Sequence, residues 1–317
     1  LQVVVPAGNG YQTRTHANFQ LQPKNCEGSS RTLHWRHQPD DETESFLELW
    51  MEECGQVEID IIAPTGQSLP TVKKNNVRFL NYINPVVWPP AWPNVIFAVC
   101  YNRFLQGGLG FGPGVVMAMA PTTSADNLRG TTPHGVWRIT IRNVTERKIT
   151  CDAYIERDDD AAGTRQGARQ SYFDDPNYDK EALEDEVIVS RRGNPSNAYA
   201  RREGVFNSIA TGRTTLVSGG VRFSDLAVAE YSPHDFYGPK PKRFGTPEQW
   251  KKDVIYAITE ESRTLRGVRV PAIRSGSSVR QAGTSVAAPQ IVRDTHNGYT
   301  PIPTNPLKPL VPPKRDC

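Results

Sequence analysis

Residues 135–142 read GVWRITIR, a run in which large apolar residues alternate with polar ones. Trp137, Ile139 and Ile141 occupy every second position, and Arg or Thr lies between them. Because successive side chains of a β-strand point to opposite faces of a sheet, this alternation predicts a strand with one buried face. The stretch therefore indicates a β-sheet region, and the neighbouring sequence shows how far it extends.

The same period-two pattern recurs on both sides, from about residue 26 to residue 157. Turn residues separate the runs, as Pro64-Thr65-Gly66 does after the run at 57–61. About six strands with no helix between them would each bury one face, which two packed antiparallel sheets satisfy. Residues 26–157 are therefore predicted to form a β-sandwich. Its predicted strands are Phe46–Trp50, Val57–Ile61, Val95–Tyr101, Val115–Met119, Trp137–Ile141 and Ile149–Ile155.

The composition and the hydrophobic pattern change on either side of this region. Residues 158–203 are charged and rich in Gly, which predicts an extended surface linker. From residue 204 the pattern is α/β, with strands predicted at Thr214–Val221 and Val254–Ile258 and a helix cap signature at 246–249. At the other end, Leu1–Val5 predicts a buried strand, whereas Tyr11–Lys24 has no clear period and predicts a loop.

Residues 283–289 read Gly-Thr-Ser-Val-Ala-Ala-Pro and carry the clearest chemical signal. A nucleophilic serine needs small neighbours so that a substrate can approach, and a helix N-terminus supplies an exposed amide. Gly283 gives that room, and Thr284 suits a helix cap. Pro289 would bend the helix, so a sequence chosen only for helix stability would avoid it. The pattern predicts that Ser285 is a nucleophile.

The motif Gly-Thr-Ser-x-Ala-x-Pro resembles the serine motif of subtilisin-like serine peptidases, the subtilases. Residues 3–10, Val-Val-Val-Pro-Ala-Gly-Asn-Gly, resemble the subtilase segment in which an apolar strand ends in Ala-Ala-Gly-Asn. Alone, Ala-Gly-Asn would be an ordinary strand-ending turn, but here it precedes the serine motif as the family requires. Residues 214–232 and 253–257 resemble the strands between the two motifs, although Ile258-Thr259-Glu260 departs from the family's usual Ala-Pro-Gly.

The resemblance implies an α/β fold class, a subtilisin-like and mostly parallel sheet. That sheet would be incomplete, with its N-terminal part absent, and interrupted by the β-sandwich. Such an insertion resembles the jelly-roll domain of some bacterial subtilases. The implied divisions are residues 1–25 (oxyanion segment), 26–157 (inserted β-sandwich), 158–203 (charged linker), 204–299 (serine segment) and 300–317 (proline-rich tail).

The resemblance also implies a serine endopeptidase that hydrolyses peptide bonds through an acyl-enzyme on Ser285. Asn9 and the Ser285 amide would stabilise the oxyanion, and residues 6–8 would line one side of the primary specificity pocket. In the family the order along the chain is Asp, His, Ser, and the oxyanion Asn follows the His. The residues implied to bind substrate are Pro6, Ala7, Gly8, Gly283 and Thr284.

Both triad partners are therefore expected before Leu1, which is not a start methionine and suggests a fragment or a processed product. None of the six histidines lies in a His-Gly-Thr motif, and the nearest, His134, suits a turn before a strand. This stretch alone is expected to be inactive. The alternative is a catalytically inactive pseudo-peptidase or binding scaffold, which would not require an intact Ser285 or Asn9. A β-sandwich adhesin with a coincidental motif explains neither Asn9 nor residues 214–232.

The composition limits the partners. The chain has 317 residues with 37 Lys plus Arg against 34 Asp plus Glu, and this charge of +3 is too weak to indicate nucleic acid or an anionic membrane. No apolar run is long enough to span a membrane. We expect a protein or peptide substrate and no cofactor. The acidic residues 158–160 leave structural calcium open, although a solvated charge run is favoured.

The compartment and the oligomeric state stay open. Subtilases are commonly extracellular or periplasmic proteins. The five scattered cysteines of this chain are equally compatible with the reducing interior of a cell. They are too scattered for a zinc site.

Overall fold

The computed structural model describes residues 3–51, 55–81, 95–101, 114–124, 130–158, 167–178, 197–212, 214–233 and 254–298. The chain divides into two compact units. The serine unit comprises Leu1–Thr13, Val189–Gly193 and Arg202–Cys317, and the β unit comprises Arg14–Ile188 and Asn194–Arg201. The helix predicted at 246–249, the tail at 300–317 and two of the three acidic residues at 158–160 lie outside the described residues.

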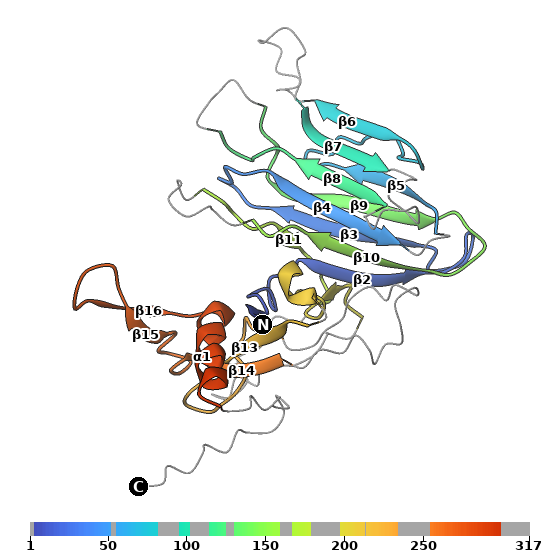
Figure 1. Ribbon diagram of the computed structural model, residues 1–317. Coiled ribbons are helices and arrows are strands. Elements are labelled where there is room, and N and C mark those ends of the chain that lie inside the picture. The colour runs from blue at the N-terminus through green and yellow to red at the C-terminus, as the bar shows by residue number, and fades with distance from the viewer. Residues whose placement is uncertain are drawn as a thin grey trace. The chain divides into compact units, whose positions relative to one another are not determined.

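The β unit contains two antiparallel sheets (Figure 1). Its strands are β2 (His16–Leu21), β3 (Ser30–His37), β4 (Ser45–Met51), β5 (Val57–Ile62), β6 (Val77–Asn81), β7 (Val95–Tyr101), β8 (Val115–Met119), β9 (Gly135–Asn143), β10 (Ile149–Ile155), β11 (Tyr172–Phe173) and β12 (Ala200–Arg201). One sheet has the order β12-β2-β10-β4-β8-β7-β6, and the other has the order β11-β3-β9-β5. The six predicted strands, three from alternation and three from apolar runs, are confirmed as β4, β5, β7, β8, β9 and β10.

The inward side chains of the two sheets share one hydrophobic core. Trp35 on β3 lies opposite Trp137 on β9, and neither is exposed. Trp137 stacks on Phe97 of the other sheet with ring centroids 5.0 Å apart. Two antiparallel sheets that enclose a common core form a β-sandwich.

The alternation rule missed two long strands of this unit. The loop predicted at Tyr11–Lys24 is wrong, because β2 forms there with His16 and Ala17 as buried residues. In β3, the inward positions include His37, which is 2% exposed. A polar or small residue at an inward position hides the period on which the prediction depends. Within the predicted linker, β11 pairs with β3 and β12 pairs with β2, so the described parts of that segment belong to the sheets.

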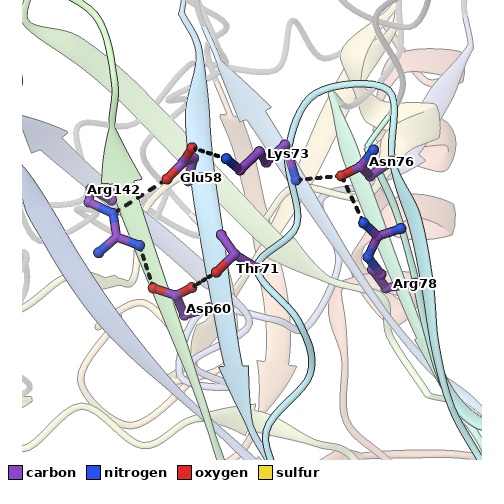
Figure 2. A network of polar contacts seen from close by, with 7 residues as sticks. All are labelled: Glu58, Asp60, Thr71, Lys73, Asn76, Arg78 and Arg142. Atoms are coloured by element: carbon purple, nitrogen blue, oxygen red, sulfur yellow. Dashed lines mark hydrogen bonds and ion pairs between the residues drawn. The ribbon is translucent and has the colours of Figure 1, made fainter.

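A network of polar contacts includes outward side chains of β5 and β9 in the four-stranded sheet (Figure 2). Glu58 and Asp60 of β5 both contact the guanidinium group of Arg142 on β9. Asp60 also accepts a hydrogen bond from Thr71, at 2.7 Å, and Glu58 pairs with Lys73 at 3.3 Å. Exposed ion pairs contribute little stability, so this face is a solvated surface that complements the apolar inner face.

The serine unit is built around a small parallel sheet. Its elements are β1 (Val4–Pro6), the 3-10 helix η3 (Ser208–Thr211), β13 (Leu216–Arg222), β14 (Val254–Glu260), β15 (Val268–Pro271), β16 (Ser278–Gln281) and α1 (Thr284–His296). β1 and β14 flank β13 and run parallel to it, and α1 packs against all three strands (Figure 1). β15 and β16 form a separate antiparallel hairpin. The strands predicted at the N-terminus, at 214–221 and at 254–258 are confirmed as β1, β13 and β14.

The predicted α/β fold class is wrong. The described residues are 43% strand and 7% helix, and most of the strands lie in antiparallel sheets. The described parallel sheet has only three strands, and α1 is the only α-helix among the described residues. The prediction failed because it assigned the fold class from two short motifs, whereas the β unit supplies most of the ordered structure.

Candidate active site

The loop after β1 and the first turn of α1 are joined by hydrogen bonds across 275 or more sequence positions. Gly8 N–H donates to Thr284 Oγ1 at 3.0 Å, and the Thr284 hydroxyl donates back to the Gly8 carbonyl at 3.0 Å. Thr284 N–H donates to Asn9 Oδ1, also at 3.0 Å. Thr284 has no exposed surface. The threonine therefore fixes the strand-end loop against the helix that carries Ser285.

These bonds orient the side-chain amide of Asn9. Oδ1 of Asn9 accepts from Thr284, so the opposite end of the amide, Nδ2, carries the two N–H donors. Neither donor makes a hydrogen bond to a described residue. Nδ2 lies 3.1 Å from the position that a Cβ on Gly283 would occupy. Gly283 also has φ 125°, a backbone conformation that favours glycine. The glycine thus lets the Asn9 amide approach the backbone just before Ser285.

Ser285 is the second residue of α1 and is exposed. Within the described residues, neither its hydroxyl nor its N–H makes a hydrogen bond. The first N–H groups of a helix have no partner within the helix, and the helix dipole makes this end favourable for negative charge. Ser285 N–H and Asn9 Nδ2 are therefore two open donors beside one exposed hydroxyl.

The helix is anchored to the sheet by a glutamine. Pro289 has no N–H to donate within the helix. The next side chain, Gln290, donates from Nε2 to the carbonyl of Ile258 on β14 at 2.7 Å and to that of Val286 at 2.9 Å. These bonds tie the second turn of the helix to the end of β14.

Two further residues hold the serine loop, and the sequence analysis did not single them out. The hydroxyl of Ser218, on β13, donates at 3.2 Å to the carbonyls of Val5 and Thr284. The hydroxyl of Tyr231 accepts from Gly283 N–H at 2.8 Å and donates to Thr259 Oγ1 at 2.7 Å. Burial raises the pKa of Tyr231, so its hydroxyl keeps the proton that it donates. A serine within an apolar predicted strand is a sequence signal that could have indicated a role for Ser218. The sequence around Tyr231 has no comparable signal.

The residues predicted to bind substrate lie together but differ in exposure. Ala7 is fully buried and belongs to the small core of the serine unit. Its carbonyl accepts a hydrogen bond from Asn207 N–H at 2.8 Å, so the segment at 205–207 runs beside the loop. Pro6 and Gly8 are half-buried. Their role in a specificity pocket stays a prediction.

The described residues offer neither a metal site nor a histidine base for Ser285. No group of three or more His, Cys, Asp or Glu among them is placed to hold a metal ion. In the described part of the serine unit the only histidine is His296, eleven residues beyond Ser285, or about 16 Å along the helix. That distance is too great for proton transfer from Ser285. None of the described helices is long and apolar enough to cross a membrane.

Comparison with solved structures relates the fold of this chain to that of a protease. No family model matches the chain, and no curated protein matches it either. The solved structure of the CspB protease from Clostridium perfringens is similar, with a TM-score of 0.57 and 16% sequence identity. The alignment covers 92% of this chain and 47% of the CspB chain, so this chain spans about half the length of that protease. The likeness shows a distant relation in fold to a protease.

Proposed function

We propose that the chain carries the nucleophile and the oxyanion-binding groups of a subtilisin-type serine endopeptidase. The observation that carries this proposal is the hydrogen bond from Thr284 N–H to Asn9 Oδ1. That bond turns the donor end of Asn9 toward the backbone beside Ser285. A strand-ending turn with no role in catalysis would not require it. The fold relation to a protease supports the same interpretation.

In the proposed reaction, the Ser285 hydroxyl attacks the carbonyl carbon of a peptide bond and forms a tetrahedral intermediate. Asn9 Nδ2 and Ser285 N–H donate to the oxyanion, and the dipole of α1 adds a favourable field. Collapse of the intermediate expels the amine and leaves an acyl-enzyme on Ser285, which water then hydrolyses. The two donors act on charge that develops only near the transition state.

Ser285 also needs a base to remove its proton. The resemblance to subtilases assigns that role to a His oriented by an Asp, both from chain that precedes Leu1. His296 is too distant, as its position along α1 indicates. We therefore propose that catalysis requires the preceding segment.

A second candidate function is an inactive pseudo-peptidase or binding scaffold. The observation that favours it is that the described part of the serine unit has no histidine within reach of Ser285. The two candidates differ in one measurable property, the reactivity of the Ser285 hydroxyl.

That property is tested with a fluorophosphonate probe on the product of the complete reading frame. We expect covalent labelling at Ser285, located by peptide mass spectrometry, and no labelling in Ser285→Ala. Labelling that persists in Ser285→Ala would refute the assignment of the nucleophile. A folded wild-type protein that stays unlabelled would favour the scaffold.

Asn9→Ala tests the oxyanion donor. We expect kcat to fall by about 10²–10³-fold while KM changes little, because the lost donor serves the transition state. Asn9→Asp is the matched control, since it keeps an oxygen for Thr284 N–H but supplies no amide donor; it should also lose activity. Equal losses in binding and turnover would indicate that Asn9 is a structural turn residue.

A further inference from the structure

The hairpin of β15 and β16 is a basic, exposed feature of the described part of the serine unit. Residues 262–282 contain five arginines and no Asp, Glu or Lys. All four residues of β16 are exposed, on both faces of the strand. The hairpin forms its own two-stranded sheet, so among the described residues no strand pairs with its outer edges. Two-stranded ribbons are marginally stable in water, and an open edge can accept an extended chain.

The arginines of the hairpin are only partly neutralised. Arg280 pairs with Glu261, and Arg266 pairs with Glu230 at 3.5 Å. Arg269 and the turn residue Arg274 are exposed and make no ion pair with any described residue. The hairpin therefore has a surplus of positive charge.

The register of the hairpin concentrates that charge. Arg269 lies directly opposite Arg280, so their side chains project from the same face. Like charges at directly opposed positions destabilise a strand pair. Arg280 already has the carboxylate of Glu261, whereas Arg269 has none, so a carboxylate brought to Arg269 would reduce the repulsion and form charge-assisted hydrogen bonds.

We propose that this hairpin binds an acidic, extended peptide segment of the substrate, a segment that flanks the bond attacked by Ser285. This inference rests on the proposed function. The strand β16 ends at Gln281, four residues before Ser285, and four residues span at most about 14 Å. An extended peptide advances about 3.3 Å per residue. Asp or Glu residues about four or more positions from the scissile bond would therefore reach the hairpin.

Two physical effects account for the recognition. The carboxylates of the peptide pair with Arg269 and Arg274, which have no ion pair among the described residues, and its backbone pairs with the open edge of β16. The charge pairing is exposed, so it depends on salt and acts over about a Debye length, roughly 8 Å at physiological ionic strength. The chain's net charge of +3 is too small to give a strong attraction between the chain as a whole and an acidic peptide.

The test measures peptide binding in the Ser285→Ala background, where no hydrolysis occurs. A fluorescent ten-residue peptide with four Glu on one side of its centre is titrated at low and at physiological salt, beside a version with Gln in place of Glu. Arg269→Gln/Arg274→Gln removes the unpaired charge of the hairpin. Arg138→Gln/Arg147→Gln removes two exposed arginines of the β unit and is the control for net charge.

We expect the Glu peptide to bind at least fivefold more tightly than the Gln peptide at low salt. The hairpin double variant should remove most of that preference, and the β-unit control should keep it. Equal binding to the hairpin variant and to the control would overturn the proposal. So would a single-stranded oligonucleotide that binds the hairpin as tightly as the Glu peptide, since it would show a general anion surface.

Labelling of Ser285 by the fluorophosphonate is measured separately on the wild type and on the hairpin variant. Unchanged labelling with lost peptide preference would support the hairpin as a substrate-docking surface. Absent labelling in both proteins with retained peptide preference would contradict the peptidase and, with it, the placement of the peptide beside a scissile bond. The two failures are therefore distinguishable.

Discussion

The β unit and the serine unit place their buried polar groups in different ways. The β unit has a large apolar core shared by two sheets, and several polar atoms are enclosed in it without a hydrogen-bond partner among the described residues. The indole N–H of Trp35 and both ring nitrogens of His37 are examples. Among its described residues, the serine unit has a core cluster of five buried residues, yet Thr284, Ser218 and Tyr231 each make two or more hydrogen bonds.

This difference between the two units indicates that one interaction type supplies stability and the other fixes the positions of atoms. Apolar burial is strong but non-directional, whereas hydrogen bonds fix the position of one atom relative to another. A small core cannot by itself hold the loop after β1 against the start of α1. The bonds through Thr284 do so, and each connects residues that are 275 or more positions apart. We infer that the β unit supplies stability, whereas the serine unit depends on its polar network for geometry.

The largest expected effect is on the core of the β unit. Trp137→Ala removes a side chain that is 0% exposed and stacked on Phe97, so we expect a loss of about 3–5 kcal/mol in the free energy of unfolding. Trp50→Ala is the control, since Trp50 is half-buried and should cost much less. Urea denaturation gives the loss, and hydrogen exchange locates it.

Hydrogen exchange also tests the comparison itself. Protection should fall in β9 and β3 and be retained in β13 and β14, if each unit is held by its own interactions. An equal loss of protection in both units would mean that they unfold as one cooperative body. The separate roles assigned to them would then be wrong.

The fold was predictable where one face of a strand is uniformly apolar. Residues 137–141 and 149–155 satisfy that condition, and both became strands as expected. The strands β2 and β3 were not predictable in the same way, because buried His16 and His37 interrupt the apolar period. The burial of His16 depends on a partner from distant sequence, because the carboxylate of Asp152 lies 3.1 Å from the His16 ring. The α/β assignment failed because a motif identifies a site and not the content of the whole chain.

The candidate site was predictable only in part. Asn9 and Ser285 stand in short motifs whose composition points to chemistry, and the structure brings their segments together through Thr284. Their catalytic roles stay predictions. Tyr231 could not be found, because its bond to Gly283 spans 52 positions and leaves no trace in the local pattern. The β15–β16 hairpin was not predicted from the sequence, and neither was its exposure.

A second prediction concerns the unpartnered histidine of the β unit. Burial lowers the pKa of His37 from 6.5 to about 3, because the charged ring would be enclosed without water. The unfolded chain then binds a proton that the folded chain does not, so stability is complete above about pH 6.5 and falls as the pH is lowered toward 3. Near pH 5 we expect a loss of about 2 kcal/mol relative to neutral pH.

His37→Leu removes this titration and both unpartnered nitrogens. We expect the variant to be about as stable as the wild type at neutral pH and more stable near pH 5, as measured by urea denaturation across that range. A pH dependence that stays unchanged in His37→Leu would show that other groups cause the acid loss. Glu260, whose pKa burial raises, would contribute in the opposite direction, because it binds its proton more readily when folded.

The smallest expected effect is a fall in kcat caused by a change in the polar network of the serine unit. Tyr231→Phe keeps the ring but leaves Gly283 N–H without its acceptor, which should loosen the backbone immediately before Ser285. Since the change displaces the oxyanion donors without altering a substrate contact, we expect kcat to fall about tenfold while KM changes less than twofold. Steady-state kinetics on the complete protein measure both constants, and thermal unfolding measures stability. Tyr172→Phe, a half-buried tyrosine of the β unit, should leave kcat unchanged. If Tyr231→Phe lowered stability but not kcat, the hydrogen bond would serve folding alone, and the contrast between a stabilising core and a positioning network would fail at this residue.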